Sequence, residues 1–445
     1  MSESLSPRLA EQGVQALIGT VWNPNGLILA KSVPVRRADS FAGTGLGASP
    51  TWFGFTIDQG GIAEDASISA VGDNRIRIDA DAVRVLPGGL AWAPAGFYDQ
   101  NGDPVPQCGR GTLQRVVAEL AENGLSAKVG HELEFQLFAA DGSPLPRQGW
   151  APYSLSGMLA HEDFLHALYA EADAVGLPIE QVHPEFAMRQ FEFSLAPADP
   201  VSAADTVVLA RLVVQRVAHQ CGYSVSFSPK PYAAEAGNGA HQHFSLTRDG
   251  VPLFSGGNEV RGLTAQGASA IGRVVELLGP LQAVIAGSVL STVRMTPNSW
   301  AGAHAGWGLE NREVAVRLIG ATAANPSGAN VEVKIIDPAS SAYIASAAVL
   351  ATMLDGILSG TSLVAEADRD PNQMSPEERR AAGIAVLSND QNAALDALDA
   401  STDLRRLLGD VLVDVIVAGR RHEAALYGDW EVERLAERFR FAWGF

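Results

Sequence analysis

Two glutamates alternate with apolar residues in the run His131-Glu132-Leu133-Glu134-Phe135, and this pattern constrains the fold more than any other feature. Successive side chains of a β-strand point to opposite faces, so both glutamates would share one face while Leu133 and Phe135 pack toward a core. The two carboxylates would then lie about 7 Å apart along the strand. Like charges that close need compensation, either from water on a solvated face or from bound cations.

The same alternation returns in three later segments. Each would present glutamate or histidine from its polar face, and these residues are Glu185 and Glu192, His241 and His243, and Glu332. Taken singly, each glutamate also fits a solvated strand, and the two histidines fit a hydrogen-bonded pair as well as metal or phosphate ligands. If the four faces converge, five carboxylates and a histidine surround one cavity and require divalent cations. Oxygen-rich ligation favours Mg²⁺ or Mn²⁺ over Zn²⁺.

Four cationic residues would share this cavity, namely Arg294, Arg312, Arg317 and Lys334. Arg312 and Arg317 are five residues apart, so only an irregular strand start would let both face one site. Carboxylates that hold metals beside arginines suit phosphoryl transfer, which depends on positioning and charge stabilisation. The chain has no Walker A sequence, so a nucleotide would be held in another way. The residues therefore predict a site that handles metals and phosphate.

Composition limits the function classes. The 445 residues are 47% hydrophobic, enough for a large core and two domains. A net charge of −18 disfavours binding to nucleic acid or to anionic membranes. Cys108 and Cys221 have neither metal-binding nor redox spacing. We find no apolar run of about 18 residues and no signal-peptide core near Met1, so we expect no membrane span and a cytoplasmic location.

A segment rich in proline, glycine and aspartate at 86–106 predicts a boundary between domains at 1–105 and 106–445. The turn at 23–26 predicts a hairpin formed by 14–22 and 27–35. The segment 43–48 matches a dinucleotide-binding pattern formally, but Pro50 follows where a helix should begin, so we expect a flexible glycine loop. Short strands are expected at 52–57, 76–78 and 82–86, and helices at 112–122, 162–175, 202–220, 264–293, 342–359, 391–399, 403–418 and 420–438.

The motifs, taken in order, resemble the glutamine synthetase family (type I-like) over nearly the whole chain. The matching segments are 131–135 (E-x-E-F), 183–192 (H-x-E…G-Q-x-E), 229–231 with 239–246 (K-P…G-x-H-x-H-x-S-L), 311–317 (N-R-x-x-x-x-R) and 332–338 (E-x-R-x-x-D-P). The resemblance implies an α+β fold, with an N-terminal β-grasp domain followed by a catalytic domain whose curved antiparallel sheet forms a half-barrel. It also implies a homo-oligomer, usually a dodecamer of two stacked hexameric rings with sites shared between subunits.

The resemblance further implies ATP and two or three Mg²⁺ or Mn²⁺ ions per site. ATP would phosphorylate the γ-carboxylate of glutamate, and an amine would then displace the phosphate. The implied residue roles are one metal held by Glu134, Glu185 and Glu192, the other by Glu132, His241 and Glu332, substrate and phosphate binding by Arg294, Arg312 and Arg317, and nucleotide contacts by Glu180, His243 and Ser245.

Departures from the family pattern indicate which member this is. The ammonia-using enzymes carry a glutamate where this chain has Trp300, and their N-terminal ammonium-binding motif has no clear match beyond Asp39-Ser40. Lys334 replaces an arginine, which keeps the charge without the bidentate fork. An aromatic residue in place of an acid favours an organic amine as acceptor, although Trp300 also fits simple loop packing.

The sequence therefore predicts an ATP-dependent γ-glutamyl–amine ligase, similar to family members that make γ-glutamylpolyamines or other γ-glutamylamides. One alternative is an ordinary glutamine synthetase that uses ammonia. The other is a non-catalytic family member kept for structure or regulation, and the presence of all six implied metal ligands argues against it.

Overall fold

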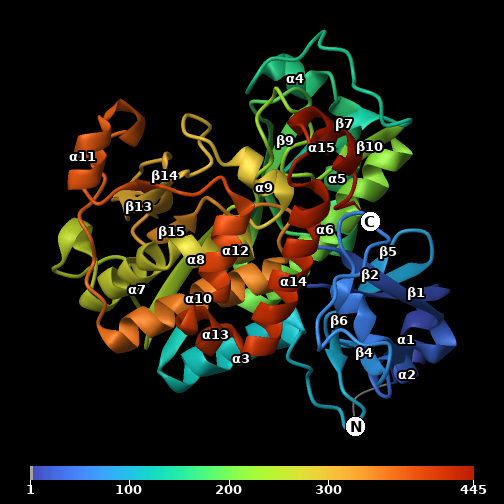
Figure 1. The fold of residues 1–445 in the computed structure, drawn as a ribbon. Helices are drawn as coiled ribbons and strands as arrows, with labels where there is room; N and C mark the ends of the chain where they lie inside the picture. Colours follow the sequence, from blue (N-terminus) through green and yellow to red (C-terminus); the bar gives the residue numbers. More distant parts are fainter. Residues whose placement is uncertain (1–3, 445) are drawn as a thin grey trace.

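Two β-sheets organise the chain in the computed structural model, which describes residues 4–444 (Figure 1). The first is six-stranded, with the order β2-β1-β6-β4-β3 and β5 paired to β6. Its strands are β1 (Ala16–Trp22), β2 (Ile28–Pro34), β3 (Leu46–Ala48), β4 (Asn74–Ile78), β5 (Arg84–Leu86) and β6 (Leu90–Tyr98). Helices α1 (Leu5–Glu11) and α2 (Ala38–Ala42) accompany it. The assignment of this part as a β-grasp domain stays a prediction.

The predicted hairpin is confirmed, since β1 pairs with β2 in antiparallel register. The side chain of Asn23 closes its turn by accepting hydrogen bonds from the backbone N–H groups of Asn25 and Leu27. Three other expectations were wrong. The segment 46–48 is a strand rather than a flexible loop, and 50–54 is a 3₁₀ helix rather than a strand. Strand β6 occupies much of the segment in which only a boundary was expected.

Local chemistry explains these differences. Pro50 stands at the start of the 3₁₀ helix, a position that suits its fixed φ, and Ser49 caps the N–H of Thr51. Gly45 has a φ of 72°, which turns the chain sharply into β3. Pro94 lies within β6, and proline argues against a strand when only the sequence is considered.

The second sheet has ten strands in the order β16-β13-β14-β15-β11-β7-β9-β8, with β10 on β7 and β12 on β11. All its pairs are antiparallel except β13 with β14, and the sheet curls into a half-barrel. Its strands are β7 (Leu125–Ala139), β8 (Ile179–Pro184), β9 (Gln190–Ala198), β10 (Tyr223–Ser226), β11 (Gln242–Arg248), β12 (Val251–Pro252), β13 (His304–Leu309), β14 (Val314–Ile319), β15 (Asn330–Val333) and β16 (Ala385–Val386).

Helices α3, α6 and α7 pack on strands of this sheet, and α10 packs in turn on all three of these helices. The helices of this part of the chain are α3 (Gly109–Glu122), α4 (Leu155–Leu159), α5 (Glu162–Val175), α6 (Pro200–Gln220), α7 (Ala265–Glu276), α8 (Leu278–Ile285), α9 (Val289–Arg294), α10 (Ala342–Ser359), α11 (Pro376–Ala381), α12 (Gln391–Asp399), α13 (Thr402–Leu408), α14 (Asp410–Tyr427) and α15 (Val432–Phe439). Most predicted helices are confirmed. The C-terminal break was misplaced, because Gly409 with a φ of 93° separates α13 from α14, which continues through residue 420.

Helix α10 has the length and apolar composition of a membrane span, contrary to the expectation that no segment would reach them. However, 78% of it is buried inside the protein, where it packs against α3, α7 and α13. Helices α7 and α8 are long and apolar enough for a membrane span only if they are joined into one, and their axes are bent by 74° relative to each other. These contacts account for the apolar character of α10 as that of a core helix.

A buried charge network joins the two parts of the chain. Arg110, at the start of α3, makes two hydrogen bonds to Asp205 on α6, at 2.9 and 2.8 Å, and a third to Asp79 of the N-terminal part, at 2.7 Å. The hydroxyl of Tyr343 on α10 donates to Asp205 as well, at 2.6 Å. Arg110 is only 6% exposed, so its removal would leave a carboxylate buried without a cation.

We expect Arg110→Met to lower the free energy of unfolding by about 3–5 kcal/mol, the usual cost of breaking a buried ion pair from one side. Urea titration followed by circular dichroism measures the change. Arg369→Met is the matched control, since Arg369 and Glu378 form an exposed pair whose loss should cost less than about 1 kcal/mol. Equal losses in the two variants would contradict a structural role for the network.

Candidate active site

The strand register brings the predicted side chains together. Glu134 on β7 stands opposite Glu192 on β9, which in turn stands opposite His183 on β8. A second row forms across β11, β15 and β14, where Glu332 lies between His243 and Arg317. Because cross-strand neighbours point to the same face of a sheet, the polar faces of the strands converge, as the sequence predicted.

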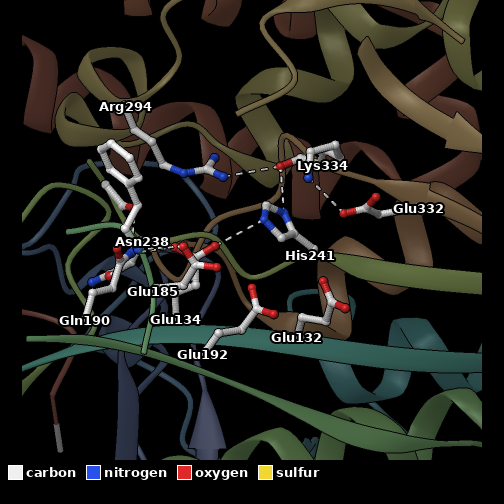
Figure 2. A network of polar contacts seen from close by, with 12 residues as sticks. Glu132, Glu134, Glu185, Gln190, Glu192, Asn238, His241, Arg294, Glu332 and Lys334 are labelled. Atoms are coloured by element: carbon white, nitrogen blue, oxygen red, sulfur yellow. Dashed lines mark hydrogen bonds and ion pairs between the residues drawn. The ribbon is translucent and has the colours of Figure 1, made fainter. Parts of the chain in front are cut away.

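These faces line a cavity of about 610 Å³, a size typical of small-molecule sites. Figure 2 shows the carboxylates of Glu132, Glu134 and Glu192 pointing into the same space as His241. The predicted residues that line the cavity are Glu132, Glu134, Glu185, Glu192, His241, Arg294, Trp300, Arg312, Arg317 and Lys334. Four others do not line it: Glu180, His243, Ser245 and Glu332.

These four residues differ in position. Glu332 is buried and holds two cavity residues, with Lys334 Nζ at 3.0 Å and Arg317 at 3.2 Å. The Nε2 atom of His243 lies 3.4 Å from Glu132. Glu180 is exposed at the start of β8, and the hydroxyl of Ser245 faces the carbonyl of Ala329 at 3.5 Å.

Three groups of side chains could each hold a metal ion. In each group every residue offers one ligand atom, and these atoms lie within 4.8 Å of one another. The groups are Glu132, His243 and Glu332; Glu134, Glu192 and His241; and His183, Glu185 and Glu192. His241 and His243 therefore group differently from the sets that the family resemblance implies. Glu192 belongs to two groups, so neighbouring ions could share it.

Burial and repulsion shape the ionisation of this cluster. Burial raises the pKa of Glu192 well above its usual range, and the charges of Glu132, Glu134 and Glu185 add to the effect. Burial also acts to raise the pKa of Glu132, but the hydrogen bond and charge of His243 outweigh it and keep that pKa low. The carboxylates thus repel one another, and divalent cations would offset this repulsion.

His241, just before β11, and His243, within it, are both oriented to act as ligands. His241 places Nδ1 3.0 Å from the carbonyl of Lys334, so this nitrogen donates and Nε2 faces Glu134 at 3.2 Å. His243 Nδ1 lies 2.9 Å from the side-chain oxygen of Asn330, and its Nε2 lies 3.4 Å from Glu132. A buried ring nitrogen directed at a carboxylate fits a cation between them. The donor set therefore fits Mg²⁺ or Mn²⁺.

The cationic residues occupy the side of the cavity formed by β14, β15 and the end of α9. Arg312 precedes β14 in an irregular turn while Arg317 lies within the strand, and this irregular start lets both line the cavity, as predicted. Arg294 ends α9 and donates to the carbonyls of Ile335 and Lys334 at 3.2 and 3.3 Å (Figure 2). Five hydrogen-bond donors on each guanidinium suit the binding of carboxylate or phosphate groups.

Sequence reasoning missed several residues of the cavity. The hydroxyl of Tyr153 donates to Glu185 at 2.8 Å, and Phe186 packs edge-to-face on Trp300 with ring centroids 5.3 Å apart. Gln190 donates to Glu134 at 2.6 Å, and Lys230 lines the wall beside Arg294. Tyr153 and Phe186 lie outside periodic segments, so their pattern gave no signal, whereas Lys230 lies in the Pro-Lys-Pro motif without an assigned role.

Comparison with known proteins identifies the family. The catalytic domain of glutamine synthetase matches residues 106–435. The chain belongs to the glutamine synthetase family. Within this family it is 34% identical, over 98% of its own length and 96% of the relative's, to a gamma-glutamylpolyamine synthetase (GlnA3) of Streptomyces coelicolor. A glutamine synthetase of Pyrococcus abyssi is 30% identical, with 78% of each chain covered.

Solved structures agree with this assignment. A structure described as a novel glutamine synthase homolog superposes with a TM-score of 0.86 at 28% identity, covering 97% of this chain and 99% of that one. A complex of GmaS with ADP superposes with a TM-score of 0.84 at 25% identity, covering 97% of both chains. The protein is therefore an ATP-dependent glutamate–amine ligase of the glutamine synthetase type.

We expect Mn²⁺ to raise the melting temperature, because a ligand that binds only the folded state at about 100 times its Kd adds about 2.7 kcal/mol of stability. Glu192→Gln should shrink this rise. Without metal the variant should melt no lower than the wild type, since burial and the neighbouring carboxylates already disfavour the charged form of Glu192 and glutamine is neutral.

Thermal melts with EDTA and with Mn²⁺ give both quantities. Glu122→Gln is the control, because Glu122 is exposed at the end of α3 and should leave the Mn²⁺ effect unchanged. Identical melting temperatures with EDTA and with Mn²⁺ would contradict the metal cluster.

Proposed function

We propose that the protein joins the γ-carboxylate of L-glutamate to an organic amine through a γ-glutamyl phosphate. The observation that carries this proposal is the aromatic pair formed by Trp300 and Phe186 on the cavity that holds the acidic cluster. The name of the Streptomyces coelicolor relative supports an organic amine as acceptor. Ordinary glutamine synthetases are also among the relatives, so ammonia is the second candidate.

The aromatic pair formed by Trp300 and Phe186 favours an organic amine over ammonia as the acceptor. Trp300 is 49% exposed and Phe186 46%, so both rings have free surface for a ligand. An indole cannot accept a proton from NH₄⁺ as a carboxylate does. It can cover a hydrocarbon chain, each buried CH₂ being worth about 0.8 kcal/mol, and can face an alkylammonium group. Free ammonia offers no such surface.

The chain's own residues account for the activation of glutamate. An oxygen of the γ-carboxylate takes the γ-phosphoryl group of ATP, and ADP leaves. The amine nitrogen then attacks the acyl carbon, phosphate leaves, and the nitrogen loses a proton to give the amide. Arg312, Arg317 and Lys334 would stabilise the negative charge of the phosphates, and Glu332 holds the last two in place. Mg²⁺ or Mn²⁺ bound to the carboxylate groups would neutralise further charge on the transferred group.

The remaining assignments rest on the composition of the sequence or on the family resemblance, and they belong to this proposal. They are the division into domains at 1–105 and 106–445, nucleotide contacts by Glu180, His243 and Ser245, two or three metal ions per site, a dodecamer with sites at subunit interfaces, and action in the cytoplasm. Neither Glu180 nor Ser245 lines the cavity. A nucleotide that contacts these two residues would therefore extend beyond the acidic cluster.

We expect the wild type to prefer an alkylamine or polyamine over ammonium in kcat/KM, and Trp300→Ala to narrow this preference by about tenfold. The reason is the loss of apolar contact equivalent to one or two CH₂ groups, about 0.8 kcal/mol each. Competition between an amine panel and ammonium, with products quantified by mass spectrometry, measures the ratio.

Tyr169→Ala serves as the control, because Tyr169 is an exposed aromatic residue on α5 that does not line the cavity. The same competition between amines and ammonium also tests the alternative that the protein uses ammonia. If the wild type forms glutamine efficiently and leaves every organic amine unused, the protein is an ordinary glutamine synthetase.

A further inference from the structure

Arg211 on α6 is a buried cation without an acidic partner. It is 1% exposed, and its two terminal nitrogens donate to the carbonyls of Pro338 and Trp443, at 3.4 and 2.7 Å. Its guanidinium lies over the rings of Trp22 and Phe227, 5.0 and 4.6 Å from their centroids. Among residues 4–444 no carboxylate forms an ion pair with it, and burial lowers its pKa to about 9. A charge in this position needs a compensating charge nearby.

A small cavity lies beside Arg211, where the two sheets and α6 meet. Its wall includes Trp22 from β1 and His131 from β7, and its volume of about 10 Å³ admits one water-sized ligand. Three buried nitrogens of this wall have no hydrogen-bond partner: Trp22 Nε1, His131 Nε2 and Arg211 Nε. The nitrogens of an indole and a guanidinium only donate, and an imidazole nitrogen donates in one of its two tautomers. The wall can therefore offer three N–H groups to one ligand.

Asp337 also lines this cavity, but its carboxylate has other partners. Its Oδ1 atom accepts a hydrogen bond from the N–H of Ala339, at 2.9 Å. Burial raises the pKa of Asp337, and the positive charges that oppose this rise are those of Arg294 and Arg420. Asp337 thus has counter-charges of its own, whereas Arg211 forms no ion pair within the described residues 4–444.

We propose that this cavity binds one monoatomic anion of the chloride class, held by the N–H groups of Trp22, His131 and Arg211. The volume leaves no room for phosphate, sulfate or a carboxylate. A water molecule would satisfy the N–H groups but would leave the charge of Arg211 uncompensated. The proposal goes beyond the proposed function and does not depend on it.

The anion would connect the two parts of the chain behind the acidic cluster. His131 directly precedes Glu132 on β7, so the ion would lie on the opposite face of the strand from the carboxylates. Trp22 belongs to the N-terminal sheet and Arg211 to the helix that packs on β7. Because the three residues come together only in the folded chain, the anion should bind the folded state and stabilise it.

Thermal melts in sodium chloride, sodium bromide and sodium gluconate at equal ionic strength test the stabilisation. We expect chloride and bromide to raise the melting temperature of the wild type by a few degrees over gluconate, which is too large for the cavity. Trp22→Phe keeps an aromatic ring for Arg211 but removes one N–H group, so it should shrink this halide effect. Trp430→Phe is the matched control, because Trp430 is partly buried outside the cavity and should leave the halide effect unchanged.

Diffraction from wild-type crystals grown in bromide locates the ion directly and does not depend on the folding of any variant. We expect an anomalous bromide peak within hydrogen-bond distance of Trp22, His131 and Arg211. An ordered water at this position, with no anomalous signal, would overturn the proposal. Equal melting temperatures in chloride and gluconate would also overturn it, as would a halide effect of the same size in Trp22→Phe and Trp430→Phe.

Discussion

Mutual repulsion among buried carboxylates is the constraint on which the rest of this site depends. Strand pairing places Glu134 and Glu192 directly opposite each other, and Glu132 and Glu185 lie close enough to raise the pKa of Glu192. A sheet held by its own hydrogen bonds and by an apolar core on its other face can keep such charges together. Divalent cations would then be bound strongly, because they relieve a cost that the fold imposes.

The cavity divides by chemistry around this cluster. Carboxylates and histidines form one wall, the cations of β14 and β15 lie next to it, and Lys230 with Arg294 forms a second cationic region. Aromatic residues complete the lining where Trp300 meets Phe186. A dicarboxylate, a nucleotide phosphate and an amine with a hydrocarbon portion each find a complementary region. The geometry thus accommodates all three substrates of the proposed ligase.

Much of the acidic cluster could be predicted because alternation along a strand fixes which side chains share a face. The hydrogen-bond partners of His241 and His243 could not be predicted from the sequence. They are the carbonyl of Lys334 and the side chain of Asn330, which come close to the histidines only through the pairing of β11 with β15. Strand β6 was missed because Pro94 interrupts its pattern. Tyr153 and Phe186 were missed because residues in irregular segments acquire a role only from what folds against them.

Transfer of oxygen from glutamate to phosphate tests the central claim most directly. With the γ-carboxylate of glutamate labelled with ¹⁸O, and with ATP, Mn²⁺ and an alkylamine or polyamine, the account predicts one ¹⁸O atom in each phosphate released, together with a γ-glutamylamide product that keeps the other label. Mass spectrometry of both species measures this. Unlabelled phosphate would show that water, rather than the carboxylate, accepts the phosphoryl group, and would contradict activation of glutamate in this cavity.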